Sequence, residues 1–236
     1  MRAAKAIFLK QVTDLPKNVS ILLLFIMYPA MAAVFTIFLD DPSFVVVFAM
    51  MFVGGTPLVA VANTIAEDVE YKSLRFLMMA GVKPYQYMLG LYGFVMILAV
   101  PTLLVFGLIG GYSPQILLVF MILCLLGCIP SAVLGAVVGI FSKNVQQCSA
   151  IYTPLMLVIG FVPFLSVFNE VVEAVGYVLF TMQIFFRIGD LTFMGDYFSI
   201  GDTGGDFIRS GLIILGNFVV FAILFAVAYK KKGLKG

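Results

Sequence analysis

Apolar residues run through this sequence in six long stretches that short polar segments separate. The stretches cover residues 19–39, 44–66, 87–109, 116–141, 149–168 and 211–229. A helix of about 20 apolar residues is long enough to cross the ~30 Å hydrocarbon core of a bilayer. The pattern therefore predicts an all-α, polytopic membrane protein with six transmembrane helices. We expect residues 1–236 to form a single transmembrane domain, because the connecting segments leave no room for a large soluble domain.

The segment before the first span, residues 1–18, mixes lysines with apolar side chains. Lys5 and Lys10 alternate with Ile7 and Leu9. Such a segment can lie in the membrane interface with its lysines toward anionic headgroups. We predict an N-terminal interfacial elbow helix here. A plain basic flank that only orients the protein is the alternative.

Residues 169–210, between the last two spans, are the hardest part of the chain to place. Their first half is nearly apolar enough for a seventh span, yet it contains Glu173, Gln183 and Arg187. With six spans and both termini in the cytoplasm, every Lys and Arg except Arg187 and Arg209 lies on the cytoplasmic side, as the positive-inside rule requires. We therefore predict a multi-pass cell-membrane protein with a re-entrant hairpin on the outer face. Other parts of the protein must shield the backbone of this hairpin from lipid.

Composition argues against an enzyme. The chain is 63% hydrophobic and 11% charged, whereas soluble domains carry about 25% charged residues. It has no histidine, and neither a phosphate-binding G-x-x-x-x-G-K-[ST] loop nor a dinucleotide glycine fingerprint occurs. We expect no cofactor or metal on this chain and no nucleic-acid partner, so any nucleotide chemistry must come from another subunit.

Two spans carry patterned small or polar residues. In the second span, Thr56 and Asn63 are seven residues apart and share one helical face, which should turn toward protein or a pathway. Interhelical hydrogen bonding explains the same stripe. In the fourth span, small residues recur at every fourth position and predict a close-packing ridge. They are Gly127, Ser131, Gly135 and Gly139.

The charged segment 67–86 joins the second and third spans. It is amphipathic, because acidic and basic residues alternate with Leu74, Phe76 and Met78. A short helix lying on a membrane face or on a partner protein suits that composition. A solvated loop is the other interpretation.

This segment resembles the signature of ABC-2 type permeases, the membrane subunits of type V ABC exporters. Lys72 and Ser73 replace the Gly-Thr of the family pattern, and Leu91 replaces its final lysine. The elbow helix, the six spans and the outer hairpin extend the resemblance along the whole chain. The residues that match the family pattern are Glu67, Leu74, Leu77, Pro84 and Gly90.

The resemblance implies a transport subunit without its own ATPase site. A separate ABC ATPase subunit would bind ATP and Mg and would dock on a coupling helix within residues 67–86, and two permeases would form a homodimer or heterodimer. The residues implied for ATPase coupling are Glu67, Glu70, Lys72, Leu74, Arg75, Phe76, Met78 and Met79. Those implied for the pathway or dimer interface are Thr56, Asn63, Tyr152, Thr153 and Met156. Those implied for an outer gate are Phe161, Pro163, Phe164 and Phe168.

The expected function is therefore export of an amphipathic or apolar substrate, such as a peptide, a drug or a lipid-like compound. An ATP-independent pore is a second hypothesis, although it would need a polar filter within the spans. An immunity or sensor membrane protein is a third.

Overall fold

The computed structural model describes residues 2–192 and 205–234, and this part of the chain is almost entirely helical. Ten α-helices and one 3-10 helix follow one another along it. Their bounds are α1 Arg2–Asp14, η1 Leu15–Lys17, α2 Val19–Leu39, α3 Ser43–Glu70, α4 Ser73–Met79, α5 Pro84–Ile109, α6 Pro114–Phe141, α7 Val145–Ser166, α8 Glu170–Gly176, α9 Phe180–Leu191 and α10 Gly205–Leu234.

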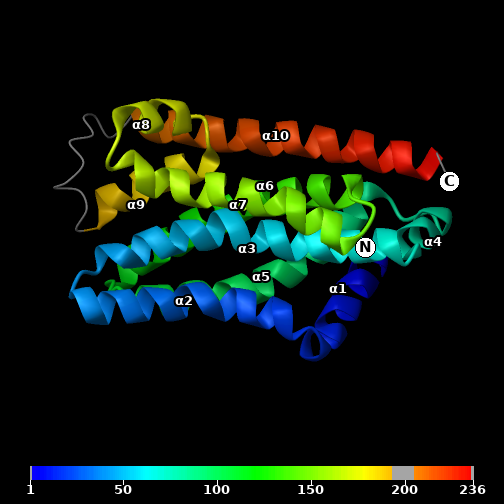
Figure 1. Ribbon diagram of the computed structural model, residues 1–236, viewed down its shortest axis with the longest axis horizontal. Coiled ribbons are helices and arrows are strands. Elements are labelled where there is room, and N and C mark those ends of the chain that lie inside the picture. Colours follow the sequence, from blue (N-terminus) through cyan, green and yellow to red (C-terminus); the bar gives the residue numbers. More distant parts are fainter. Residues whose placement is uncertain (1, 193–204, 235–236) are drawn as a thin grey trace.

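Six of these helices are long and apolar enough to cross a membrane, as the sequence predicts. They are α2, α3, α5, α6, α7 and α10, and they lie roughly side by side (Figure 1). The two chain ends, α1 and α4 lie at one end of this bundle, which we call the terminal end. The turn between α2 and α3 lies at the other end with α8 and α9, and we call this the hairpin end (Figure 1).

Helix α3 is the centre of the bundle, since 89% of its most apolar stretch is buried. Helix α6 approaches it closely along the predicted small-residue ridge. A Cβ added to Gly135 would lie 2.2 Å from the Leu58 carbonyl oxygen, and the Ser131 hydroxyl donates to the Gly54 carbonyl over 3.0 Å. The ridge is confirmed as a packing surface.

The hairpin between the last two spans is also confirmed as a bent helix pair. Helices α8 and α9 meet at 117°, and residues 180–189 of α9 are all buried among the surrounding helices. A buried polar chain ties α9 to α10. The Arg187 Nε donates to the Ser210 hydroxyl over 3.2 Å, and that hydroxyl donates to the Gln183 side-chain oxygen over 2.9 Å. The polar side chains that α9 buries are therefore satisfied within the protein.

Most helices extend beyond the predicted spans into polar sequence, whereas α7 ends at Ser166, two residues before the predicted end of the fifth span. Helix α3 runs to Glu70 and α5 starts at Pro84, so the coupling loop is shorter than 67–86. Proline suits this first helical position, where its missing N–H is not needed. Helix α7 starts at Val145 because the Asn144 side chain accepts from the Gln147 N–H over 2.7 Å.

Prolines within the spans also proved compatible with helix. Pro57, Pro101, Pro154 and Pro163 all lie inside helices, and α7 continues past Pro163 to Ser166. Helix α10 starts at Gly205, before the expected residue 211, and this brings Ser210 onto the helix that faces Arg187.

Replacement of glycine by alanine should have opposite effects on stability at the contact between α6 and α3 and at an open position on α10. Gly135→Ala should lower stability by about 1–3 kcal/mol, because the new methyl group collides with backbone. Gly216→Ala on α10 meets no atom within 4 Å and should raise stability by about 0.5–1 kcal/mol through helix propensity. Thermal unfolding of the two purified variants in one detergent measures both. Equal melting temperatures would contradict this account of the ridge.

Candidate functional site

The buried carboxylate of Asp68 joins four helices at the terminal end of the bundle. Asp68 is only 5% exposed, near the end of α3. Its Oδ1 accepts from the Lys10 ammonium of α1 over 3.0 Å and from the Ser73 hydroxyl of α4 over 2.6 Å. Its Oδ2 accepts from the Tyr87 hydroxyl of α5 over 2.6 Å. We call these four residues the Asp68 junction.

The chain reverses sharply between α3 and α4 to reach this arrangement. Lys72 has a positive φ of 61° and turns the backbone at the end of α3. The turn brings Ser73, the first residue of α4, back over Asp68, where its hydroxyl also donates to the Asp68 carbonyl over 3.2 Å. The position of α4 is thus fixed at its N-terminus.

Helix α4 divides its side chains between the bundle and the outside. Leu74 is 3% exposed and belongs to the main core, and Met78 is half-buried against that core. Phe76 and Met79 are 66% and 65% exposed. Met78 is therefore placed inward, whereas Phe76 and Met79 project from the surface together with the neighbouring charged residue Arg75.

The acidic residues expected to flank a partner have different positions. The Glu70 carboxylate accepts from the Val145 N–H over 3.0 Å, so it lies at the N-terminus of α7, where a negative charge is favourable. Glu67 is half-buried, and Lys72 is exposed. The segment 67–79 therefore connects α3 to α7 as well as to α1 and α5.

A cavity of about 420 Å³ lies beside the Asp68 junction, between α1 and α4. Lys10 and Asp68 form part of its wall, with Phe76 and Leu77 from α4 and Ala80 directly after that helix. Ser73 in the first turn of α4 borders the same space. Within the described residues no three His, Cys, Asp or Glu side chains gather as a metal site requires.

Three of the candidate pathway residues, Asn63, Tyr152 and Met156, make contacts between helices. Asn63 of α3 donates through Nδ2 to the Tyr152 hydroxyl of α7 over 3.4 Å, and Met156 lies 3.8 Å from the Tyr28 hydroxyl through its sulfur. These residues bring α2, α3 and α7 together. Thr56, in contrast, is completely buried within the chain.

Thr153 is exposed on α7, and its hydroxyl bonds back to the Ser149 carbonyl over 2.7 Å. Among the predicted gate residues, Phe164 and Phe168 form an edge-to-face pair with centroids 5.3 Å apart at the hairpin end. Phe161 is half-buried and Pro163 is buried. Phe168 is 72% exposed.

Sequence reasoning missed the role of Asp68, which it treated as one more charge of a loop. The available signal was helical spacing, because Val61, Ile65 and Asp68 fall at i, i+4 and i+7 on one face if the helix continues. Its partner Lys10 lies 58 residues away, a distance that no local pattern bridges. Sequence also gave no indication that Tyr87 would face inward.

No protein-family model matches this chain, and no curated protein matches it either. The fold alone therefore defines its class. The six apolar helices and the shielded bent pair make it a multi-pass helical membrane protein, associated with a lipid bilayer.

The Asp68 junction predicts unequal effects for its two charged members. Asp68→Ala should cost about 2–3 kcal/mol, since it leaves the buried Tyr87 hydroxyl without an acceptor and removes the shorter of the two hydrogen bonds that Ser73 donates. Lys10→Ala should cost less than about 1 kcal/mol, because the Lys10 side chain is 51% exposed and Asp68 keeps its other two donors. Denaturant unfolding of both variants tests the ranking. A Lys10 variant as unstable as the Asp68 variant would contradict it.

Proposed function

We propose that this protein is the permease subunit of an ATP-binding cassette exporter. In this proposal a separate ATPase subunit binds ATP and Mg and docks on α4, and two permeases enclose the path. The cargo is an amphipathic or apolar compound such as a peptide, a drug or a lipid-like molecule. The resemblance of residues 67–90 to ABC-2 type permeases supports this assignment.

The observation that carries the proposal is the construction of α4. Phe76 and Met79 are large apolar side chains exposed at the terminal end, beside the charged residues Lys72 and Arg75. Apolar anchors with a charged rim are typical of protein interfaces. Leu74 and Ser73 attach the same helix to the bundle, so force applied at α4 reaches α3 directly.

Coupling also requires an element with two arrangements. The cavity between α1 and α4 provides space for α4 to move toward α1. The Asp68 carboxylate contacts α1, α4 and α5 together, so a displacement of α4 would be transmitted to several spans.

The terminal end would face the cytoplasm, because Lys5, Lys83, Lys143 and Lys230 all belong to segments at that end. Helices α2 and α7 would contribute to the permease interface. Only 28% and 22% of their most apolar stretches are buried, which leaves wide apolar faces. Thr56, being fully buried, is not part of that surface in the single chain.

Purification from native membranes tests the proposal. An ATP-hydrolysing subunit with its own G-x-x-x-x-G-K-[ST] motif should co-purify with the wild-type chain. Phe76→Asp and Met79→Asp should each weaken the complex by roughly 30-fold, about 2 kcal/mol, as the loss of an apolar interface anchor does.

Val175→Asp is the matched control, because Val175 is 75% exposed on α8 at the opposite end of the bundle. It should retain the ATPase fully. If the protein is an ATP-independent pore, no ATPase should co-purify with it, or the amount that co-purifies should be the same for the wild type and both α4 variants. Either result would refute the proposed function.

A further inference from the structure

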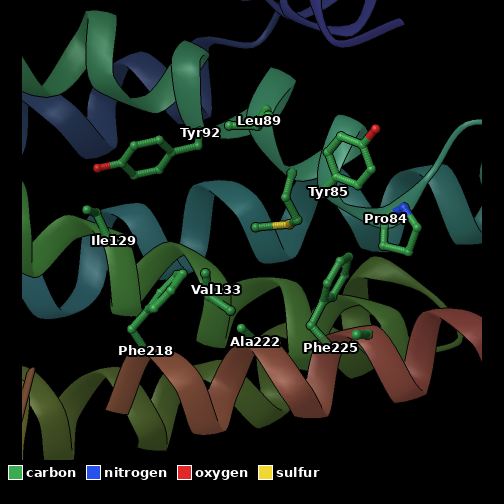
Figure 2. Close-up of a pocket in the computed structure, with 11 residues that line it drawn as sticks. Pro84, Tyr85, Leu89, Tyr92, Ile129, Val133, Phe218, Ala222 and Phe225 are labelled. Atoms are coloured by element: carbon green, nitrogen blue, oxygen red, sulfur yellow. The ribbon is translucent and has the colours of Figure 1, made fainter. Parts of the chain in front are cut away.

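An apolar groove of about 520 Å³ opens between α5 and α10 in the half of the bundle nearest the terminal end. Its floor is α6, which contributes Ile129 and Val133 (Figure 2). From α10, Phe218 and Phe225 project toward α5, and the small residue Ala222 lies between them (Figure 2). The groove exists because Ala222 and Ala226 leave space that larger side chains would fill.

The groove lies within three membrane-spanning helices and all eleven residues that line it are apolar or aromatic. Two of its residues on α5, Tyr85 and Leu89, are 57% and 60% exposed, so the groove is accessible from outside the bundle. In a bilayer its natural occupant is an apolar chain, since its polar groups are limited to the Tyr85 and Tyr92 hydroxyls, and that of Tyr92 donates to the Leu125 carbonyl over 3.5 Å.

The volume favours a flexible chain over a helix from another subunit. One turn of an α-helix with its side chains occupies roughly 400 Å³, from a diameter of about 10 Å and a pitch of about 5.4 Å. A space of about 520 Å³ would take little more than one such turn. It suits a lipid acyl chain.

A pair of basic residues lies where the groove reaches the terminal end. There the Tyr229 hydroxyl of α10 donates to the Val82 carbonyl over 3.0 Å, which brings the two walls together. Lys83 and Lys230 each follow directly after one of these residues. Lys230 also continues the row of Phe218, Ala222 and Ala226, each four positions apart on α10, which places it on the groove side.

Both lysines are exposed, and neither has an ion-pair partner among residues 2–192 and 205–234. The carboxylate of Asp68, which reaches Tyr87 behind this contact, is already paired with Lys10. The positive charge at this end of the groove is therefore available to a negatively charged group.

We propose that this groove is a binding site for an anionic phospholipid. One acyl chain lies between α5 and α10 against Phe218 and Phe225, and the phosphate lies by Lys83 and Lys230. Apolar burial supplies affinity for any phospholipid, and the lysines supply preference for an anionic headgroup. The site is independent of the proposed ATPase partner, since no residue of α4 takes part in it.

Photolabelling of the wild-type protein in lipid nanodiscs tests this site directly. The probe is phosphatidylglycerol with a diazirine on one acyl chain, and the labelled peptides are mapped by mass spectrometry. Labelling should concentrate on residues 84–92 and 218–226 and should exceed that of the exposed α2 residues Leu23 and Ile26 severalfold. Even labelling of all exposed faces would overturn the proposal, and no variant is needed for this result.

Two kinds of variant separate the acyl chain from the headgroup. Ala226→Phe fills the groove and should reduce labelling of both segments to the level of α2, whereas Val227→Phe on the exposed side of α10 should not. Lys83→Gln and Lys230→Gln should each lower the preference for phosphatidylglycerol over phosphatidylcholine about fivefold. Lys5→Gln, an exposed lysine on α1, is the charge control.

An unchanged preference in the Lys83 and Lys230 double variant would overturn the assignment of the headgroup. Labelling that survives Ala226→Phe would overturn the assignment of the acyl chain. If a photoreactive phenylalanine analogue placed at position 85 or 218 captures a protein segment in place of lipid, a partner helix occupies the groove, and this result would also refute the proposal.

Discussion

The arrangement of the terminal end depends on one buried carboxylate. A carboxylate at 5% exposure is stable only when hydrogen bonds and an opposite charge compensate for the water it loses. Asp68 obtains these from α1, α4 and α5 at once, through Lys10, Ser73 and Tyr87. The same side chain therefore positions α1, α4 and α5. A large movement of any of them would break a hydrogen bond to this buried carboxylate.

Helix α3 extends this constraint along the bundle. Its 28 residues form one continuous helix of roughly 42 Å, and close packing of α6 against it requires glycine where backbone meets backbone. At the hairpin end α3 also packs against α9. The same rigid helix thus contacts both the Asp68 junction and the buried hairpin, which is the continuity that a coupling mechanism between the two ends would use.

The two proposed sites lie on either side of the start of α5. On one side α5 follows directly from α4, the proposed docking helix, and on the other it forms one wall of the lipid groove. Tyr87 of α5 bonds to Asp68, and its ring lies 6.3 Å from that of Tyr229 on α10. A lipid held between α5 and α10 would contact the helix that follows α4, so the two proposals would depend on one structural element, α5.

The sequence by itself determined the fold class, the six spans and the small-residue ridge of α6, because apolar length and four-residue spacing are local properties of the chain. It also indicated the amphipathic segment that becomes α4. Only the tertiary structure decided which polar residues are buried: Lys10 meets Asp68 across 58 positions, and Ser210 meets Arg187 across 23. Such contacts allow helices to extend into polar segments that the sequence suggested were loops. A polar side chain can be buried on a helix when the folded protein provides its hydrogen-bond partner. The groove likewise depends on where α5 and α10 come together, and no local pattern specifies that.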